Sequence, residues 1–240
     1  MSARDRMRAL YGEELGAMEG VLHVVAVHAE GESRRVIKIG EHAPESATDF
    51  FALELARARV EAIVITGAIL REEPELRYVL SSELAAWRRE VLGLAEPPWL
   101  LVLTHGDIPL DHPALSGPLR PIVFTSSEAA PSLRARTSIE RTSIEIVGVP
   151  APSARLALSF LRSERGCRSV SVEAGPTTAV PLYDEPCAID ELALSVYGGP
   201  LDPRARGGRF LDERALERRF ERVSEASGGE WRFERWLRRG

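Results

Sequence analysis

Apolar residues fall in short runs along the chain, and polar or turn-forming residues separate one run from the next. Most runs are nearly continuous, which is typical of strands buried on both faces of a parallel sheet, and the last alternates in part. The run at 21–27 is apolar almost throughout, so we expect it near the centre of the sheet. Strands are predicted at 21–27, 36–39, 62–65, 99–104, 122–125, 143–149, 169–172 and 189–197.

Helical spacing of apolar residues fills several of the stretches between these runs. It predicts helices at 47–60, 80–92 and 153–165, with Ser46 as an N-cap and Gly166 as a stop. Strands that alternate with helices predict an α/β fold with a mainly parallel central sheet and helices on both faces.

The end of the chain has a different pattern. Two polar-rich stretches, one with Phe220 and the other with Trp231, Phe233 and Trp236, flank the glycine pair at 228–229. A glycine pair between such stretches predicts a C-terminal antiparallel hairpin. The aromatic residues exceed what an edge hairpin needs for itself, and edge strands invite pairing. We therefore expect a homodimer that uses this C-terminal sheet.

Composition supports this class of fold. The chain has 240 residues, of which 44% are apolar but only 6% aromatic, and this suits an α/β core better than an aromatic-rich sandwich. Residues 1–20 are charged and partly helical in pattern, and are predicted to be an N-terminal extension. Residues 21–240 are predicted to form a single domain.

Charge excludes several classes of function. With 31 basic and 36 acidic residues the net charge is −5, so a general nucleic-acid role is not expected. The basic residues at 204–239 alternate with acidic ones, which favours a solvated charged face over a binding patch. No apolar run is long enough to span a membrane, and residues 1–20 do not resemble a signal peptide, so we expect a cytoplasmic protein.

Catalytic and metal-binding patterns are sparse. Cys167 and Cys187 form no disulfide framework and have no metal-ligand spacing, so both are expected to be free thiols and no metal is predicted. The chain has no Ser-His-Asp order, no His-Glu-x-x-His and no P-loop pattern. Hydrolase, zinc-enzyme and P-loop functions therefore lack support.

The segment at 170–178 carries the strongest candidate chemistry. A predicted strand turns through Ala174 and Gly175, and Pro176 has the fixed φ of a first helical residue. Such a turn brings free backbone N–H groups together and favours an anion, above all a phosphate. An ordinary strand-to-helix turn would have the same residues, and the two interpretations remain open.

Other strand ends would join this turn. In a parallel sheet, ligands bind beyond the carboxyl ends of the strands. The small or polar residues at 66–68, 104–106, 125–127 and 173–177 each follow a predicted strand. If the sheet forms as predicted, these four segments lie along one edge.

These segments resemble the reductase domain of the bifunctional riboflavin-biosynthesis deaminase/reductase, a dihydrofolate-reductase-like family. Residues 172–177 read Val-Glu-Ala-Gly-Pro-Thr where the family has Val-Glu-Gly-Gly-Pro-Thr, and residues 189–192 read Ile-Asp-Glu-Leu where it has Val-Asp-Glu-Leu. Residues 61–74 contain Glu-Ala, Thr-Gly-Ala and Glu-Glu-Pro in the order of the family's Asp-Ala, Gly-Thr and Asp-Asp-Pro. The resemblance covers roughly 21–238 and includes nothing of the deaminase half.

The resemblance implies a dihydrofolate-reductase-like fold and an activity. The family uses NADPH to reduce the ribosyl group of a pyrimidine ribosylamine phosphate to ribityl, and it is commonly dimeric. By resemblance the cofactor phosphates would lie at Ala174, Gly175, Pro176 and Thr177, with Glu173 at the start of the turn.

The same resemblance assigns the rest of the cofactor site. Thr66, Gly67 and Ala68 would lie against the nicotinamide side. Thr104 and Thr125 would stand at strand ends where the family contacts the adenosine half. The substrate would be a phosphorylated pyrimidine or a similar small molecule.

Several positions depart from the family pattern. Glu30 stands where the family has aspartate, Glu73 lies in a Glu-Glu-Pro that replaces Asp-Asp-Pro, and Ala68 lacks an expected hydroxyl. A longer carboxylate keeps its charge but shifts its oxygens, and a misplacement of ~1 Å can cost on the order of 10²-fold in rate. The substrate can therefore differ, or the protein can be a non-catalytic nucleotide-binding protein that senses or scaffolds.

Individual side chains also have structural interpretations. Glu30 and Glu73 are candidates for substrate binding, but loop carboxylates are often only solvated. His28 is either a proton donor or phosphate contact, or a structural residue at a strand end. Glu173 can hydrogen-bond the backbone of its own turn instead of a ligand.

Overall fold

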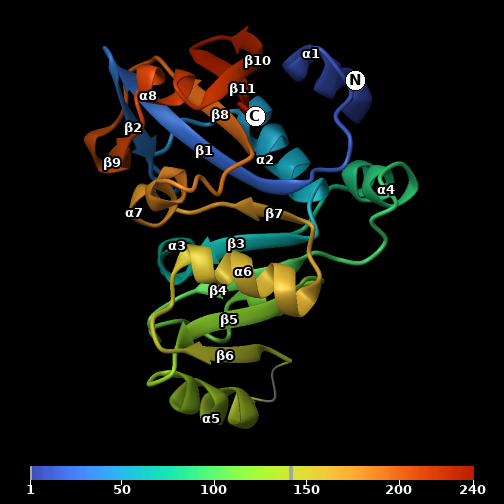
Figure 1. Ribbon diagram of the computed structural model, residues 1–240, viewed down its shortest axis with the longest axis vertical. Helices are drawn as coiled ribbons and strands as arrows, with labels where there is room; N and C mark the ends of the chain where they lie inside the picture. The colour runs from blue at the N-terminus through green and yellow to red at the C-terminus, as the bar shows by residue number, and fades with distance from the viewer. Residues whose placement is uncertain (1, 141–142) are drawn as a thin grey trace.

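The computed structural model describes residues 2–140 and 143–240, which fold around an eleven-stranded sheet (Figure 1). Along its main path the sheet has the order β10-β11-β8-β1-β7-β3-β4-β5-β6, and β2 and β9 continue from β1. The strands are β1 (Gly20–Glu30), β2 (Ser33–Ile37), β3 (Ala62–Thr66), β4 (Trp99–Leu103), β5 (Arg120–Ser126), β6 (Glu145–Val149), β7 (Ser169–Val172), β8 (Glu191–Tyr197), β9 (Arg206–Phe210), β10 (Phe220–Gly228) and β11 (Trp231–Arg238).

The centre of the sheet is parallel and its flanks are antiparallel. Strands β8, β1, β7, β3, β4, β5 and β6 run in one direction. Strand β11 is antiparallel to β8, and β10 is antiparallel to β11. Strands β2 and β9 form a second antiparallel extension from the far end of β1. The predicted dihydrofolate-reductase-like class, mainly parallel with a C-terminal hairpin, is confirmed.

Eight α-helices occur in the described residues. Ser46 and Ser153 cap α2 and α6 by accepting a hydrogen bond from the backbone N–H three residues on, and Gly166 ends α6 in the left-handed conformation. The helices are α1 (Ala3–Tyr11), α2 (Ala47–Ala58), α3 (Gly67–Glu72), α4 (Ser82–Glu90), α5 (Ala130–Glu140), α6 (Ala154–Arg165), α7 (Pro176–Ala179) and α8 (Glu213–Glu217). Short 3₁₀ turns lie at Pro113–Leu115, Val180–Tyr183 and Pro203–Ala205.

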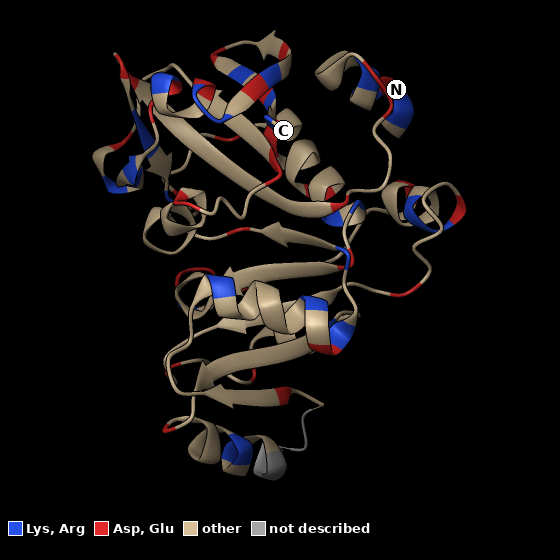
Figure 2. Ribbon diagram, in the orientation of Figure 1, with Lys and Arg blue, Asp and Glu red and all other residues tan. Residues whose placement is uncertain are grey.

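Apolar residues pack on both faces of the sheet. On one face, Ala157, Leu158 and Leu161 of α6 pack against alternate residues of β7, β3 and β4. On the other, α2 contributes Phe51 and Leu55 to a core shared with α1 and the C-terminal hairpin. Figure 2 shows charged residues gathered over α1, α4 and the β9–β10 region, while β3 and β4 carry none.

The predicted elements are confirmed with small shifts in their ends, but some were missed. Neither α5 nor β9 was predicted; β9 has the sequence Arg-Gly-Gly-Arg-Phe, which lacks apolar alternation and forms a strand only by pairing with β2. The partial alternation of β8 would leave some of its side chains exposed. All of its residues are buried instead, between β1, β11 and covering helices. Gly229, with φ +62, turns the hairpin as predicted.

Two further expectations have different outcomes. Residues 3–11 form α1, which packs Met7 and Leu10 into the core, while the division at residue 20 into extension and domain stays a prediction. No helix within residues 2–140 and 143–240 combines the length and apolar character that a membrane crossing requires.

Candidate functional site

The predicted site segments meet along one edge of the sheet, which we call the carboxyl edge because the parallel strands end there. Thr66 at the end of β3 pairs with Leu103, and Leu103 pairs with Phe124 of β5, so the ends of these strands are in step. On the other side of β3, Val64 pairs with Val172 at the end of β7. Helices α3 and α7 begin at this edge (Figure 1). The structure therefore brings together the residues at 66–68, 104, 125 and 173–177.

The turn after β7 is fixed on one side and open on the other. Ala174 is buried in the main core, so its methyl group points inward and does not obstruct the outer side of the turn. Gly175 has φ −61 and ψ 166, and a Cβ built on it would meet no atom within 4 Å. Pro176 then begins α7, and the Gly175 carbonyl accepts bonds from the N–H groups of Thr178 and Ala179, both at 3.0 Å.

Free backbone donors lie at the outer side of this turn. Among the described residues, the N–H groups of Gly175 and Thr177 donate no hydrogen bond, and Pro176 between them has none to donate. The turn therefore presents unpaired donors next to open space, the arrangement that an anionic group such as a phosphate needs.

Gly67 and Thr104 are in close contact at the ends of β3 and β4. A Cβ on Gly67 would lie 2.9 Å from the Thr104 Oγ1 atom, so only glycine allows the two strand ends to approach this closely. The Thr104 hydroxyl accepts from the Gly106 N–H at 3.2 Å and so holds its own loop in place. Beside it, Thr66 precedes α3, and Ala68 is in the first turn of that helix.

Thr125 is completely buried at the end of β5. Within the described residues its hydroxyl has no hydrogen-bond partner, although a buried hydroxyl ordinarily has one. The side chain therefore shapes the carboxyl edge from below rather than reaching its surface.

Glu30 does not lie on the carboxyl edge itself. Strand β1 continues past its last pair with β7, and Glu30 ends that extension. Its carboxylate is 3.2 Å from Arg35 Nε, 3.5 Å from Arg206 Nε and 3.6 Å from His28 Nδ1. Strand β9 leads from this cluster back to the turn, because Gly208 is packed against Pro176. Glu30 is thus part of a charged cluster rather than a solvated loop carboxylate.

One ring nitrogen of His28 makes a structural hydrogen bond, and the other faces the Glu30 cluster. Its Nε2 atom lies 2.9 Å from the Gly199 carbonyl oxygen, a contact in which the ring N–H donates. Its Nδ1 atom and the Glu30 Oε1 atom face each other, and both are buried without a hydrogen-bond partner in the described part of the chain.

Glu73 lies one short helix away from the carboxyl edge. It caps α3, and its Oε1 atom would be 3.2 Å from a Cβ on Gly40, so it lies against the loop that leads to α2. Partial burial, with Glu72 beside it, raises the pKa of the Glu73 carboxyl. The structure keeps Glu73 on the same side of the molecule as Gly67 but does not bring it into contact with Glu30.

Glu173 makes an ion pair that the sequence did not indicate. The Arg57 guanidinium donates from Nε at 2.9 and 3.1 Å and from Nη2 at 2.6 Å to the two Glu173 oxygens. Tyr78 stacks on the same guanidinium, 4.2 Å from it. The partner of Glu173 is therefore an arginine of α2, not the backbone of the turn. Local sequence contains no signal for this pair, since its residues are far apart in the chain.

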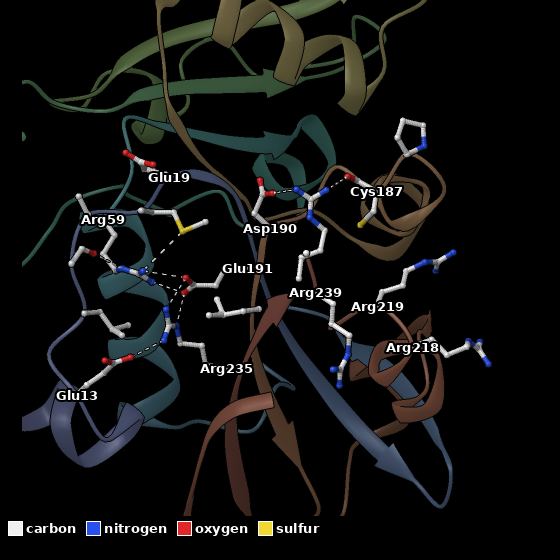
Figure 3. Close-up of a pocket in the computed structure, with 18 of the residues that line it drawn as sticks. Glu13, Glu19, Arg59, Cys187, Asp190, Glu191, Arg218, Arg219, Arg235 and Arg239 are labelled. Carbon is white, nitrogen blue, oxygen red and sulfur yellow. Dashed lines mark hydrogen bonds and ion pairs between the residues drawn. The ribbon is translucent and has the colours of Figure 1, made fainter. Parts of the chain in front are cut away.

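A large cavity lies at the opposite edge of the sheet, which we call the amino edge because the parallel strands begin there. It has a volume of about 1080 Å³ and is lined by Arg59, Glu191, Arg235 and other charged residues (Figure 3). Arg59 and Arg235 both pair with Glu191, and Arg238 pairs with Asp190. The charged groups of this cavity mostly bind one another.

Comparisons by sequence find nothing: no protein-family model matches the chain, and no curated protein matches it. Comparison of structures finds a pyrimidine reductase-like protein from Corynebacterium diphtheriae, with a TM-score of 0.69 and 18% identity over 100% of both chains. The riboflavin biosynthesis reductase Rib7 of Saccharomyces cerevisiae has a TM-score of 0.59 and 14% identity over 97% of both chains.

A third similar structure is RibD of Acinetobacter baumannii. It has a TM-score of 0.66 and 16% identity over 92% of this chain. The chain spans 58% of the length of that protein. At these identities the likeness establishes the architecture alone: the chain has the dihydrofolate-reductase-like fold of these three proteins.

Proposed function

We propose that the protein is an NADPH-dependent reductase. Its substrate would be a pyrimidine ribosylamine phosphate, whose ribosyl group it reduces to ribityl, or a similar small molecule. The observation that carries the proposal is the turn at 174–177. It lies at the carboxyl edge between β1 and β3, with open space above Gly175 and unpaired N–H groups beside it. Ligands bind at this edge in open α/β sheets.

The residues of the carboxyl edge fit a dinucleotide. The N–H groups of Gly175 and Thr177 would hold the pyrophosphate, and the Thr177 hydroxyl would add a donor. Thr66, Gly67 and Ala68 would face the nicotinamide. NADPH supplies a hydride when bound, and the chain's contribution is to position the acceptor carbon and exclude water.

The adenosine half would lie beyond Gly67, over β4 and β5. Thr104 and Thr125 end these two strands, and both are buried. In the proposal these threonines form the floor under the adenosine half and do not bond to it. The Thr104 hydroxyl already accepts a hydrogen bond within its own loop.

Substrate would enter between the edge and the Glu30 cluster. Arg35 and Arg206 lie beside the Glu30 carboxylate, and carboxylates accept hydrogen bonds from sugar hydroxyls. The raised pKa of Glu73 lets that carboxyl carry its proton to a higher pH than usual, which suits a group that shares a hydrogen bond with a hydroxyl.

A non-catalytic nucleotide-binding protein is the second candidate. Two observations favour it: the Glu30 carboxylate is already engaged by two arginines, and Ala68 offers no hydroxyl at the strand end. Such a protein would bind NADPH but would not oxidise it with any pyrimidine ribosylamine phosphate. Steady-state absorbance of NADPH with that substrate separates the two candidates.

The test of the shared step is calorimetric titration of NADPH and NADH into wild type and two valine variants. Gly175→Val adds a branched side chain where the phosphate would approach, and should weaken NADPH binding about 100-fold while leaving the fold intact. Gly16→Val is the matched control, because Gly16 also has no atom within 4 Å of an added Cβ but lines the amino-edge cavity. It should bind like wild type.

The result that would remove the proposal is the absence of heat with wild type. At about 100 μM protein, even a site with a Kd of ~10⁻⁴ M registers. Equal weakening by both valine variants would also contradict binding at the turn. The homodimer stays a separate prediction that light scattering can test, and β10 supplies the unpaired edge strand that it requires.

A further inference from the structure

We propose that Arg57 is the positioning residue of the dinucleotide turn: through its buried ion pair with Glu173 it fixes where the turn begins and so where its free N–H groups point. This inference rests on the proposed function for its ligand, but its structural part can be tested without one. Arg57 itself is buried and reaches the carboxyl edge through its ion pair with Glu173.

The geometry of the pair is that of a two-pronged arginine–carboxylate contact. Arg57 Nε and Nη2 both donate to Glu173, with Nη2 to Oε2 at 2.6 Å. The two side chains are only 9% and 7% exposed. Water therefore does not compete for these bonds, and the planar fork restricts the orientation of the carboxylate as well as its position.

Tyr78, in the segment between α3 and α4, completes the cluster. Its ring lies 4.2 Å from the Arg57 guanidinium, and burial raises the pKa of its hydroxyl, so the ring stays neutral. Burial alone would lower the pKa of Arg57, but the Glu173 carboxylate outweighs burial and raises it. The Arg57 guanidinium therefore keeps its charge in the folded protein.

The position of Glu173 makes the pair relevant to the turn. Its own N–H donates to the Val64 carbonyl at 2.9 Å, so both its backbone and its side chain are held. Ala174 follows in the core, and Gly175 is already in the open. Only Ala174, itself packed in the core, separates Glu173 from Gly175, so the orientation of Glu173 carries over to the N–H groups at 175 and 177.

Stability alone does not account for such a pair. A buried ion pair can often be replaced by apolar residues without loss of stability, because the desolvation of two charges offsets their attraction. What apolar residues cannot reproduce is a fixed direction. The pair is therefore best understood as a device that orients the turn.

A second buried pair on the same helix provides a matched control. Arg59, the C-cap of α2, donates to Glu191 at 2.6 Å, and these side chains are 5% and 3% exposed. Glu191 begins β8, so this pair lies at the amino edge, where Figure 3 shows it together with Arg235. The two pairs match in chemistry, burial and helix, and differ in the edge that they reach.

The experiment compares Arg57→Lys with Arg59→Lys. Lysine keeps the charge but loses the planar fork, so both variants should fold with lower urea midpoints. Arg57→Lys should raise the Kd for NADPH about 10-fold, because the N–H groups of the turn are displaced, while Arg59→Lys should leave it within about 2-fold. If the reductase proposal holds, kcat at saturating NADPH should change less than KM in Arg57→Lys.

Hydrogen exchange supplies a measurement that needs no ligand. The amides of Thr178 and Ala179 are protected by their bonds to the Gly175 carbonyl. Their exchange should accelerate in Arg57→Lys and stay at the wild-type rate in Arg59→Lys. If wild type binds no dinucleotide, the proposed function fails, but this exchange still decides the role of Arg57.

A double variant covers the case in which Arg57→Lys does not fold. Arg57→Met/Glu173→Leu removes both charges together and should retain stability. It should nevertheless lose protection at Thr178 and bind NADPH as weakly as Arg57→Lys. Wild-type protection at Thr178 in a folded variant that lacks the pair would overturn the inference, as would equal effects of Arg57→Lys and Arg59→Lys on exchange at the turn.

Discussion

The two edges of the sheet hold their charges in opposite ways. At the amino edge, a cavity of about 1080 Å³ is lined by arginines and carboxylates, and most of these bind one another. At the carboxyl edge, the turn at 174–177 has no charged side chain, and its free polar groups are backbone N–H groups. The amino-edge cavity is therefore the poorer candidate site, because a ligand there would have to displace existing ion pairs.

The groups beneath the two edges also differ. Under the carboxyl edge, His23 of β1 is fully buried and its Nδ1 atom lies 2.7 Å from the Tyr183 hydroxyl. Burial lowers the pKa of His23 to about 4, against a weaker opposing effect of the Ala174 backbone. At the amino edge, burial would raise the pKa of Glu191, but Arg59 and Arg235 outweigh burial and lower it. The buried titratable group at the carboxyl edge, His23, is therefore neutral, and the one at the amino edge, Glu191, is ionised.

Lowering the pH should therefore remove the stabilising contribution of His23 first and that of Glu191 second. This is the largest effect that we expect. Unfolded protein binds a proton at His23 below its ordinary pKa of 6.5, whereas the folded protein resists until about 4. Stability is thus present above pH 6.5 and lost as the pH falls toward 4, by up to about 3 kcal/mol. The pKa of Glu191 is lowered, so its contribution is lost only as the pH falls below the ordinary value of 4.5.

Urea unfolding at pH 7 and at pH 4.5 measures this effect. Wild type should lose more stability between the two pH values than His23→Phe, which has no group to titrate at that position. Equal pH dependence of wild type and His23→Phe would show that the carboxyl edge does not rest on a neutral histidine.

Glycines give a second, smaller contrast between the edges. At the amino edge, Gly20 has φ +89, and a Cβ there would overlap the Asp190 carboxylate. Gly20→Ala should cost about 1–3 kcal/mol, since it combines a strained backbone with a clash. Gly175→Ala meets open space and ordinary backbone angles, so its stability should stay within about 0.5 kcal/mol of wild type.

Thermal unfolding of these two alanine variants makes the comparison quantitative. A large loss of stability in Gly175→Ala would show that the fold, and not a ligand, requires glycine in the turn. The expected outcome is that the amino-edge glycine is a requirement of the backbone and the carboxyl-edge glycine is not.

The smallest effect concerns a polar residue at the carboxyl edge that belongs to the fold alone. Ser153 follows β6, and its hydroxyl accepts the Leu156 N–H at 3.3 Å as the N-cap of α6. Ser153→Ala should lower the free energy of unfolding by about 1 kcal/mol. Its Kd for NADPH should equal that of wild type, and a weakened Kd would extend the site to the end of β6.

Much of the fold could be predicted from the pattern of apolar runs. The runs that became β1, β3 and β4 are apolar on both faces, which identified a parallel sheet and placed the polar strand ends on one edge. The turn at 174–177 could also be located, because glycine and proline restrict the backbone locally. Local chemistry determines both features, so a single sequence contains them.

The contacts behind the turn could not be predicted in the same way. Arg57 and Glu173 are 116 positions apart and meet only because α2 packs on β1, which pairs with β7 in the sheet. Strand β9 likewise depends on β2 for its pairing and has no apolar pattern of its own. The sequence pattern predicts a loop at Glu30, but the strand continues as far as that residue, and two arginines from other strands reach its carboxylate. These features arise from tertiary packing, which periodicity does not report.

The place of β7 in the sheet has a consequence for how the molecule folds. Strand β7 (Ser169–Val172) lies between β1 and β3 in the sheet. Both of these strands come much earlier in the chain, since β3 ends at Thr66. An early β1–β3 pairing would have to open again to admit it, and such distant parallel pairs form slowly. We therefore expect β1 and β3 to stay apart until β7 is available, and the insertion of β7 between them to create the turn at 174–177 as well.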